Sequence, residues 1–161
     1  MELYSLTVIL GGLLLGFILY RGAKSDLSNR TFPKEYFDKN IVYICGFFTA
    51  ITYLSLIASG FWGKAVVYFF ISVIAAIVFW FMGLRFGSGG DWRAMIYIAL
   101  FSPFILLSTC IITFFSSAIL AVYSVWRCDD NTPRLYRTVP FAVAIFVGYV
   151  AAVCIFVISN L

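Results

Sequence analysis

Residues 94–126 read AMIYIALFSPFILLSTCIITFFSSAILAVYSVW, a long run without one charged side chain. As a single helix with a rise of 1.5 Å per residue it would be about 50 Å long, whereas the hydrocarbon layer of a bilayer is about 30 Å thick. Ser102-Pro103 lies near its start, and proline interrupts the hydrogen bonds of a helix. We therefore predict a short helix over Trp92–Phe101, a reversal of the chain, and a full-length helix from about Phe104 to Trp126.

The rest of the chain contains four more uncharged runs, each of a length that suits one membrane crossing. They are Leu3–Tyr20, Ile41–Gly63, Ala65–Leu84 and Thr138–Leu161. Hydrophobic residues make up 63% of the 161 residues and charged residues only 11%, whereas a soluble domain is about half apolar. We predict an all-α integral membrane protein with six transmembrane helices, in which residues 1–161 form a single membrane-embedded domain.

The distribution of basic residues distinguishes six helices from five. With six helices, ten of the eleven Lys and Arg residues lie on one side of the membrane and only Lys64 lies opposite; with residues 94–126 as one span, the split would be seven to four. Because basic residues concentrate on the cytoplasmic side, we expect six helices in the cytoplasmic membrane, with Asp26 and Asp91 at the cytoplasmic face. The net charge of +4 favours contact with anionic membrane lipids and no nucleic acid.

Several kinds of chemistry are absent from the sequence. There is no histidine, which excludes triads and zinc sites built on imidazole. The glycines of residues 87–90 are not followed by the Lys-Ser/Thr of a phosphate-binding loop. The four cysteines form no CxxC pair and fit buried, inert thiols; they are Cys45, Cys110, Cys128 and Cys154. We predict no metal and no cofactor.

Two aspartates stand at predicted helix ends. Asp26 follows the first apolar run, and Asp91 closes Gly87-Ser88-Gly89-Gly90-Asp91 at the start of the short helix. Carboxylates are costly at such positions and are functional candidates for that reason. Each also has an ordinary explanation: Asp26 can pair with Lys24 or Arg30, and Asp91 can cap the short helix by accepting backbone N–H bonds.

Three segments together resemble the prepilin and preflagellin peptidases, which are membrane aspartic proteases with a GxGD motif. Asp26-Leu27-Ser28-Asn29-Arg30-Thr31-Phe32-Pro33 is similar to the family's Asp-x-x-x-Arg-x-Ile-Pro segment. Gly87 through Asp91, followed by Arg93 and a helix that reaches Pro103, is similar to the GxGD segment. Val139-Pro140-Phe141-Ala142 is similar to the start of the family's last helix. The resemblance spans nearly the whole chain.

The resemblance implies an aspartic endopeptidase of the short, peptidase-only form. Asp26 and Asp91 are then the catalytic pair, and Gly89 and Gly90 let an extended substrate backbone approach Asp91. The implied substrate is a type IV prepilin-like or preflagellin precursor, whose basic leader (class III signal) peptide is removed at the cytoplasmic face. Acidic residues of the polar segments are candidates to hold the basic leader; they are Glu35, Asp38, Asp129 and Asp130. Methyltransferase activity is not implied, because the sequence lacks the cysteine-paired segment of the family's longer members.

The sequence departs from the family pattern at three positions. Ser88 replaces the first Gly of GxGD, Phe32 replaces the usual Ile, and Lys34 replaces an Asn. The Ser88 change leaves open an inactive homologue that still binds pilins. A separate alternative is a non-catalytic carrier or pilus-assembly factor, in which the two aspartates relay ions or pair with Arg30 and Arg93.

Overall fold

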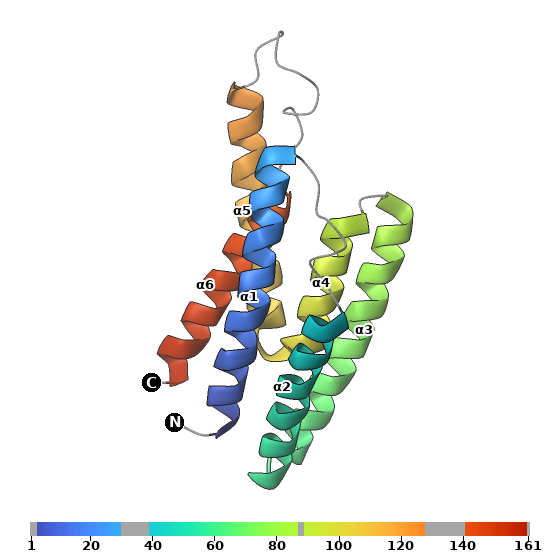
Figure 1. Ribbon diagram of the computed structural model, residues 1–161, viewed down its shortest axis with the longest axis vertical. Coiled ribbons are helices and arrows are strands. Elements are labelled where there is room, and N and C mark those ends of the chain that lie inside the picture. Colours follow the sequence, from blue (N-terminus) through green and yellow to red (C-terminus); the bar gives the residue numbers. More distant parts are fainter. Residues whose placement is uncertain (1–2, 30–38, 87–88, 128–140, 161) are drawn as a thin grey trace.

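The computed structural model describes residues 3–29, 39–86, 89–127 and 141–160, and within these ranges all regular structure is helical (Figure 1). The elements are α1 (Leu3–Asn29), α2 (Lys39–Ala58), α3 (Trp62–Phe86), α4 (Gly89–Phe101), the 3-10 turn η2 (Pro103–Ile105), α5 (Leu106–Arg127) and α6 (Phe141–Asn160). Within the described residues, five helices are long and apolar enough to cross a membrane, and α4 is the short exception with 13 residues. The prediction of an all-α multi-pass membrane protein whose short fourth helix begins at the glycine motif is confirmed.

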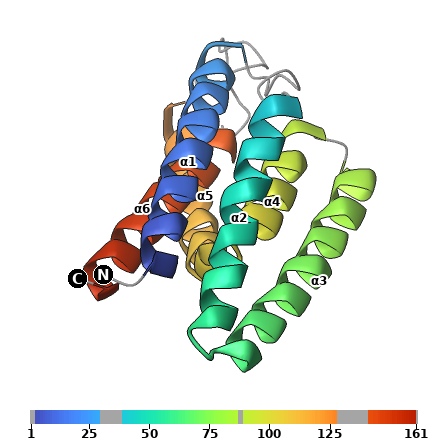
Figure 2. The ribbon, with the colours of Figure 1, turned by 60° about the horizontal axis from the view of Figure 1, so that its bottom comes forward.

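Successive helices run in opposite directions. The ends of α1, α3 and α5 and the beginnings of α4 and α6 gather at the top of Figure 1, which we call the motif end; both termini and the α2–α3 turn lie toward the other end. Figure 2 shows α3 at one edge of the bundle, α1 and α6 at the other, and α2 and α4 between them. Four exposed basic residues lie at the motif end and Lys64 at the opposite end; the four are Arg21, Lys24, Arg85 and Arg93.

Helix α1 is longer than its apolar sequence indicates. We placed Asp26 just past the first apolar run, which ends at Tyr20, at the junction between helix and loop, but α1 continues to Asn29. The expectation was wrong because hydropathy marks the apolar part of a helix, whereas basic side chains such as Arg21 and Lys24 can prolong it by extending toward water. Asp26 therefore occupies a helical position, and the direction of its side chain is set by α1.

The turn between α2 and α3 is closed by glycine. Gly60 has φ of 82°, a left-handed conformation that residues with a Cβ rarely adopt. The N–H of Gly60 donates to Ile57 O at 3.0 Å and the N–H of Phe61 donates to Leu56 O at 2.9 Å, which is the Schellman arrangement that ends a helix. The chain can thus reverse within three residues and begin α3 at Trp62.

The predicted break at Ser102-Pro103 is present, and it is buried. Pro103 has no N–H, so the carbonyl oxygen of Ala99 lacks its usual helical donor. The hydroxyl of Ser72 in α3 donates to this oxygen at 2.7 Å. A carbonyl that the proline leaves unsatisfied is thus paired by a neighbouring helix, as a non-aqueous interior requires.

Two further hydroxyl groups fasten the same break. The hydroxyl of Thr49 in α2 is shared between two carbonyl oxygens, that of Cys45 in its own helix at 2.9 Å and that of Phe101 at 3.1 Å. The hydroxyls of Ser102 and Tyr149 are joined by a 2.8 Å hydrogen bond, and Tyr149 belongs to α6. Helices α2, α3 and α6 thus each contribute one hydroxyl to the end of α4.

The core lies where α1, α4 and α6 meet. Leu15 and Leu19 of α1, Ile98 of α4, and Ile145 and Tyr149 of α6 are almost completely buried in one cluster. The cluster places the inward faces of these three helices around a common interior. The functional candidates at the motif end continue two of these faces.

Helices α5 and α6 approach closely at Gly148. A Cβ atom at Gly148 would lie 2.8 Å from the backbone nitrogen of Thr113 and 3.0 Å from the carbonyl oxygen of Thr109. Small residues at such positions let membrane helices pack backbone to backbone. This contact holds α5 against the side of α6 and leaves the outer face of α5 open.

Candidate functional site

Asp26 lies on the inward face of α1. Leu15, Leu19, Ala23 and Asp26 recur at helical spacing and are all buried, and Asp26 is only 9% exposed. Its Oδ2 atom is fully screened from solvent, whereas Lys24 beside it is exposed. The first aspartate is therefore directed at the bundle and not at the surrounding water.

Asp91 lies in the first turn of α4 and is partly buried. It continues the stripe of Ala94, Met95 and Ile98, each of which is buried in the core. Arg93, two positions on, is exposed. The N-terminal turn of a helix favours negative charge through its free N–H groups and dipole, so this position suits a carboxylate.

Both aspartates lie at the motif end of the bundle, and both lie on helix faces that point inward. Asp26 lies about two turns beyond Leu19 toward the motif end, and Asp91 lies about two turns from Ile98 toward the same end. Leu19 and Ile98 belong to one core cluster, and α1 and α4 contact each other. Both carboxylates thus stand on the motif side of that cluster, while their direct pairing stays a prediction.

Helix α6 contacts both of the helices that carry the aspartates. The rings of Trp92 and Phe141 have centroids 6.2 Å apart, which joins the start of α4 to the start of α6. The rings of Tyr20 and Phe146 have centroids 5.7 Å apart, which joins α1 to α6. The residue that directly follows the second sequence motif and the first helical residue of the third, far apart in the chain, are therefore neighbours in space.

Trp92 is a positioning residue that sequence reasoning missed. The ring of Trp92 stacks with that of Phe79 in α3, with 6.4 Å between the centroids. Helix α3 also approaches closely at Gly83, where an added Cβ would lie 3.0 Å from the Cβ of Trp92. The side chain thus holds the start of α4, and Asp91 with it, between α3 and α6. The available signal was a large aromatic directly after the aspartate and a glycine near the end of the preceding span.

The remaining predicted site residues have simpler outcomes. Gly89 and Gly90 are the first two residues of α4, so they precede Asp91 within its own helix. The other acidic candidates, Glu35, Asp38, Asp129 and Asp130, lie outside the described residues, as do Arg30 through Pro33, Lys34, Gly87, Ser88 and Pro140.

Sulfur and carboxylate groups do not cluster in the part of the chain that the structure describes. Cys45 is buried in α2, Cys110 partly buried in α5 and Cys154 exposed on α6, and all three are free thiols. No group of three or more Cys, Asp or Glu side chains there could hold a metal ion. Cys128 lies outside the described residues.

No family model, no curated protein and no solved structure matches this chain. The fold and the site define its class on their own: a multi-pass α-helical membrane protein with one buried and one partly buried aspartate on inward helix faces at one end of the bundle.

Proposed function

We propose that this protein is an aspartic endopeptidase of the cytoplasmic membrane, which removes the leader peptide from type IV prepilin-like or preflagellin precursors. The observation that carries the proposal is the burial of Asp26. The neighbouring positions of α1 at Lys24 and Leu27 are exposed, so α1 offers solvated places for a charge. A buried carboxylate at the edge of a membrane is costly, and a catalytic role explains why it is there.

The proposed chemistry needs two carboxyl groups in opposite states. Two carboxylates held close cannot both ionise easily, so a pair formed by Asp26 and Asp91 retains one proton. The ionised member takes a proton from a water molecule while the oxygen of that water attacks the scissile carbonyl. The protonated member donates to the developing oxyanion or to the leaving amine.

The glycines and the fold contribute access and position. Gly89 and Gly90 have no side chains, so an extended substrate backbone can approach Asp91 along the start of α4. The substrate segment must be unwound, because the peptide bonds of a helix are engaged in its own hydrogen bonds. A junction between a basic leader and an apolar helix, at the border of the membrane, is a segment where such unwinding is least costly.

The experiment that tests the proposal is cleavage of a purified precursor by the purified, reconstituted protein. The precursor carries a short basic leader followed by an apolar helix, and conversion to the mature form is followed on gels. We expect the wild type to cut at the junction, and Asp26→Asn and Asp91→Asn to leave the precursor intact. Cleavage by Asp91→Asn at the wild-type rate would contradict the aspartic mechanism, and no cleavage by the wild type would favour the non-catalytic carrier or assembly factor.

A further inference from the structure

The third sequence segment, Val139-Pro140-Phe141-Ala142, has no part in the proposed chemistry, because it carries no ionisable or nucleophilic side chain. Phe141 is the first residue of α6, and its side chain is partly buried against the core cluster. The ring of Phe141 and the ring of Trp92, the residue directly after Asp91, have centroids 6.2 Å apart. The segment therefore contacts the first turn of α4, where the second aspartate lies.

The same helix contacts α1 about one and a half turns further on. The rings of Phe146 and Tyr20 have centroids 5.7 Å apart, and Tyr20 precedes Asp26 on α1. Phe141 and Phe146 lie about 140° apart around the axis of α6 and about 7.5 Å apart along it. One ring thus contacts the helix that carries Asp91, and the other contacts the helix that carries Asp26.

The middle of α6 is fastened to the rest of the bundle. Ile145 is completely buried in the core cluster. Gly148 lies against α5, where an added Cβ would be 2.8 Å from the backbone nitrogen of Thr113, and the hydroxyl of Tyr149 is joined to that of Ser102 at 2.8 Å. Close packing at small residues and polar contacts between helices are what hold membrane helices together. A helix fastened in this way can keep its two ring contacts at a constant separation.

We propose that Phe141 is a positioning residue of the peptidase, which acts through Trp92 to hold Asp91 at a fixed separation from Asp26. Phe146 does the same for α1. The inference rests on the proposed function and gives the third sequence segment a role in it. Acid–base catalysis needs its groups within hydrogen-bond reach of the reacting atoms, and a displacement of about 1 Å can lower a rate about 100-fold. Contacts that set the separation of the two carboxyls therefore act on the rate.

The first test removes the ring and then restores it. Phe141→Ala should lower kcat for precursor cleavage by about 10- to 100-fold with KM little changed, because the placement of the carboxyls is lost and not the binding of substrate. Phe141→Tyr retains a ring at the membrane border, where tyrosine is well accommodated, and should recover most of kcat. An unchanged kcat in Phe141→Ala, or no recovery in Phe141→Tyr, overturns the proposal.

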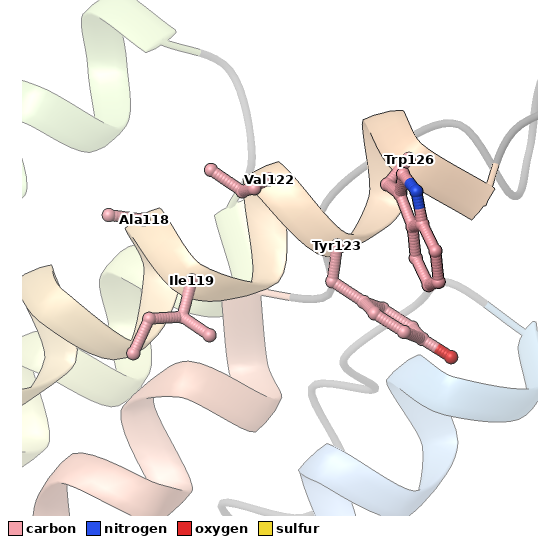
Figure 3. Close-up of a pocket in the computed structure, with 5 residues that line it drawn as sticks. All are labelled: Ala118, Ile119, Val122, Tyr123 and Trp126. Carbon is pink, nitrogen blue, oxygen red and sulfur yellow. The ribbon is translucent and has the colours of Figure 1, made fainter.

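Two control variants remove rings elsewhere. Phe156→Ala removes a ring from the far part of α6 that is partly buried against the same core cluster. Trp126→Ala removes a ring that is 84% exposed and lines a shallow apolar pocket along the last turns of α5 (Figure 3). Both variants should retain the wild-type kcat. A loss in Phe156→Ala as large as that in Phe141→Ala would assign the effect to the stability of α6 and overturn the positioning role.

The second test measures the separation of α1 and α4 without cleavage. In a chain whose four native cysteines are replaced by serine, Lys24→Cys and Arg93→Cys carry spin labels, because both positions are exposed and adjoin the aspartates without replacing them. Pulsed EPR gives the distribution of distances between the two labels. We expect Phe141→Ala to shift or broaden this distribution and Phe156→Ala to leave it as in the wild type. The same distribution in all three proteins overturns the proposal.

The two proposals fail separately. A changed distance in Phe141→Ala combined with no cleavage by the wild type retains Phe141 as the residue that places α4 and removes the peptidase. Cleavage by the wild type combined with an unchanged kcat and distance in Phe141→Ala retains the peptidase and removes the role of Phe141.

Discussion

The two ends of α4 interrupt the bundle in different ways. At Ser102-Pro103 the break is buried, and neutral hydroxyls from three helices surround it. At the other end, Asp91 and Arg93 bring charge to the first turn, and the contacts that hold the turn are aromatic rings packed around Trp92. The break at Ser102-Pro103 is thus stabilised by neutral groups. The negative charge of Asp91 suits the N-terminal turn of α4, and we propose that it also serves function.

The comparison predicts its largest effect at the charged end. Asp26→Asn and Asp91→Asn should each lower the cleavage rate by roughly 10²–10⁴-fold, the usual contribution of a positioned acid or base. Because both groups act in one transition state, the double variant should be little worse than either single variant. Thermal melting in detergent should show that all three proteins fold. Single losses that multiply in the double variant would mean that the aspartates act independently.

The next largest effect concerns pH. A pair that needs one proton is inactive when both carboxyls are protonated and when both are ionised, so the rate should fall on both sides of an optimum. The rate of precursor cleavage is measured across the pH range in vesicles of constant composition. A rate that stays flat from strongly acidic to strongly alkaline conditions would remove the shared proton from the mechanism.

At the neutral end of α4 we expect a loss of stability with activity retained. Ser72→Ala removes the donor to the Ala99 carbonyl oxygen and should lower the free energy of unfolding by about 1–3 kcal/mol, the cost of leaving a buried polar group unpaired. Ser117→Ala is the matched control, because the Ser117 hydroxyl makes only an exposed hydrogen bond to Phe114. Denaturant titration compares the two, and equal stabilities would show that the hydroxyl does not support the break.

The smallest effect should come from the third hydroxyl contact. Tyr149→Phe retains the buried ring and removes one hydrogen bond to Ser102. Because a serine hydroxyl can rotate toward another acceptor, we expect a loss of about 0.5–1.5 kcal/mol. A double-mutant cycle with Ser102→Ala measures the coupling between the two groups. Strictly additive losses would show that the pair does not interact.

Much of the fold follows from the sequence, because three strong local signals agree. Apolar length, the position of basic residues and the proline at 103 predicted the number of helices, their alternation between the two ends of the bundle and the break. Which end faces the cytoplasm stays a prediction. The continuation of α1 to Asn29 did not follow, since Arg21 and Lys24 interrupt the apolar run without ending the helix. Hydropathy cannot distinguish a helix that ends at the border of the membrane from one that continues past it.

The site was only partly accessible to sequence reasoning. The motifs identified Asp26 and Asp91 as candidates, and both lie on inward stripes. The hydroxyl of Ser72 and the ring of Trp92 act through partners distant in the chain. The role of Ser72 depends on helix packing that no local pattern in the sequence indicates, and the large aromatic after Asp91 is only a weak signal for the role of Trp92.

The central claim, that Asp26 and Asp91 meet in one site, is tested most directly by thiol crosslinking. The four native cysteines are first replaced by serine, and Asp26→Cys is then combined with Asp91→Cys. The control pair combines Lys24→Cys with Asp91→Cys, because Lys24 is exposed whereas Asp26 is buried. A short bifunctional thiol reagent is added, and the chain is cut at a protease site inserted between α1 and α2, so that only crosslinked fragments stay together. We predict that the 26–91 pair crosslinks and the 24–91 pair does not. A crosslink in the control pair alone would contradict the claim.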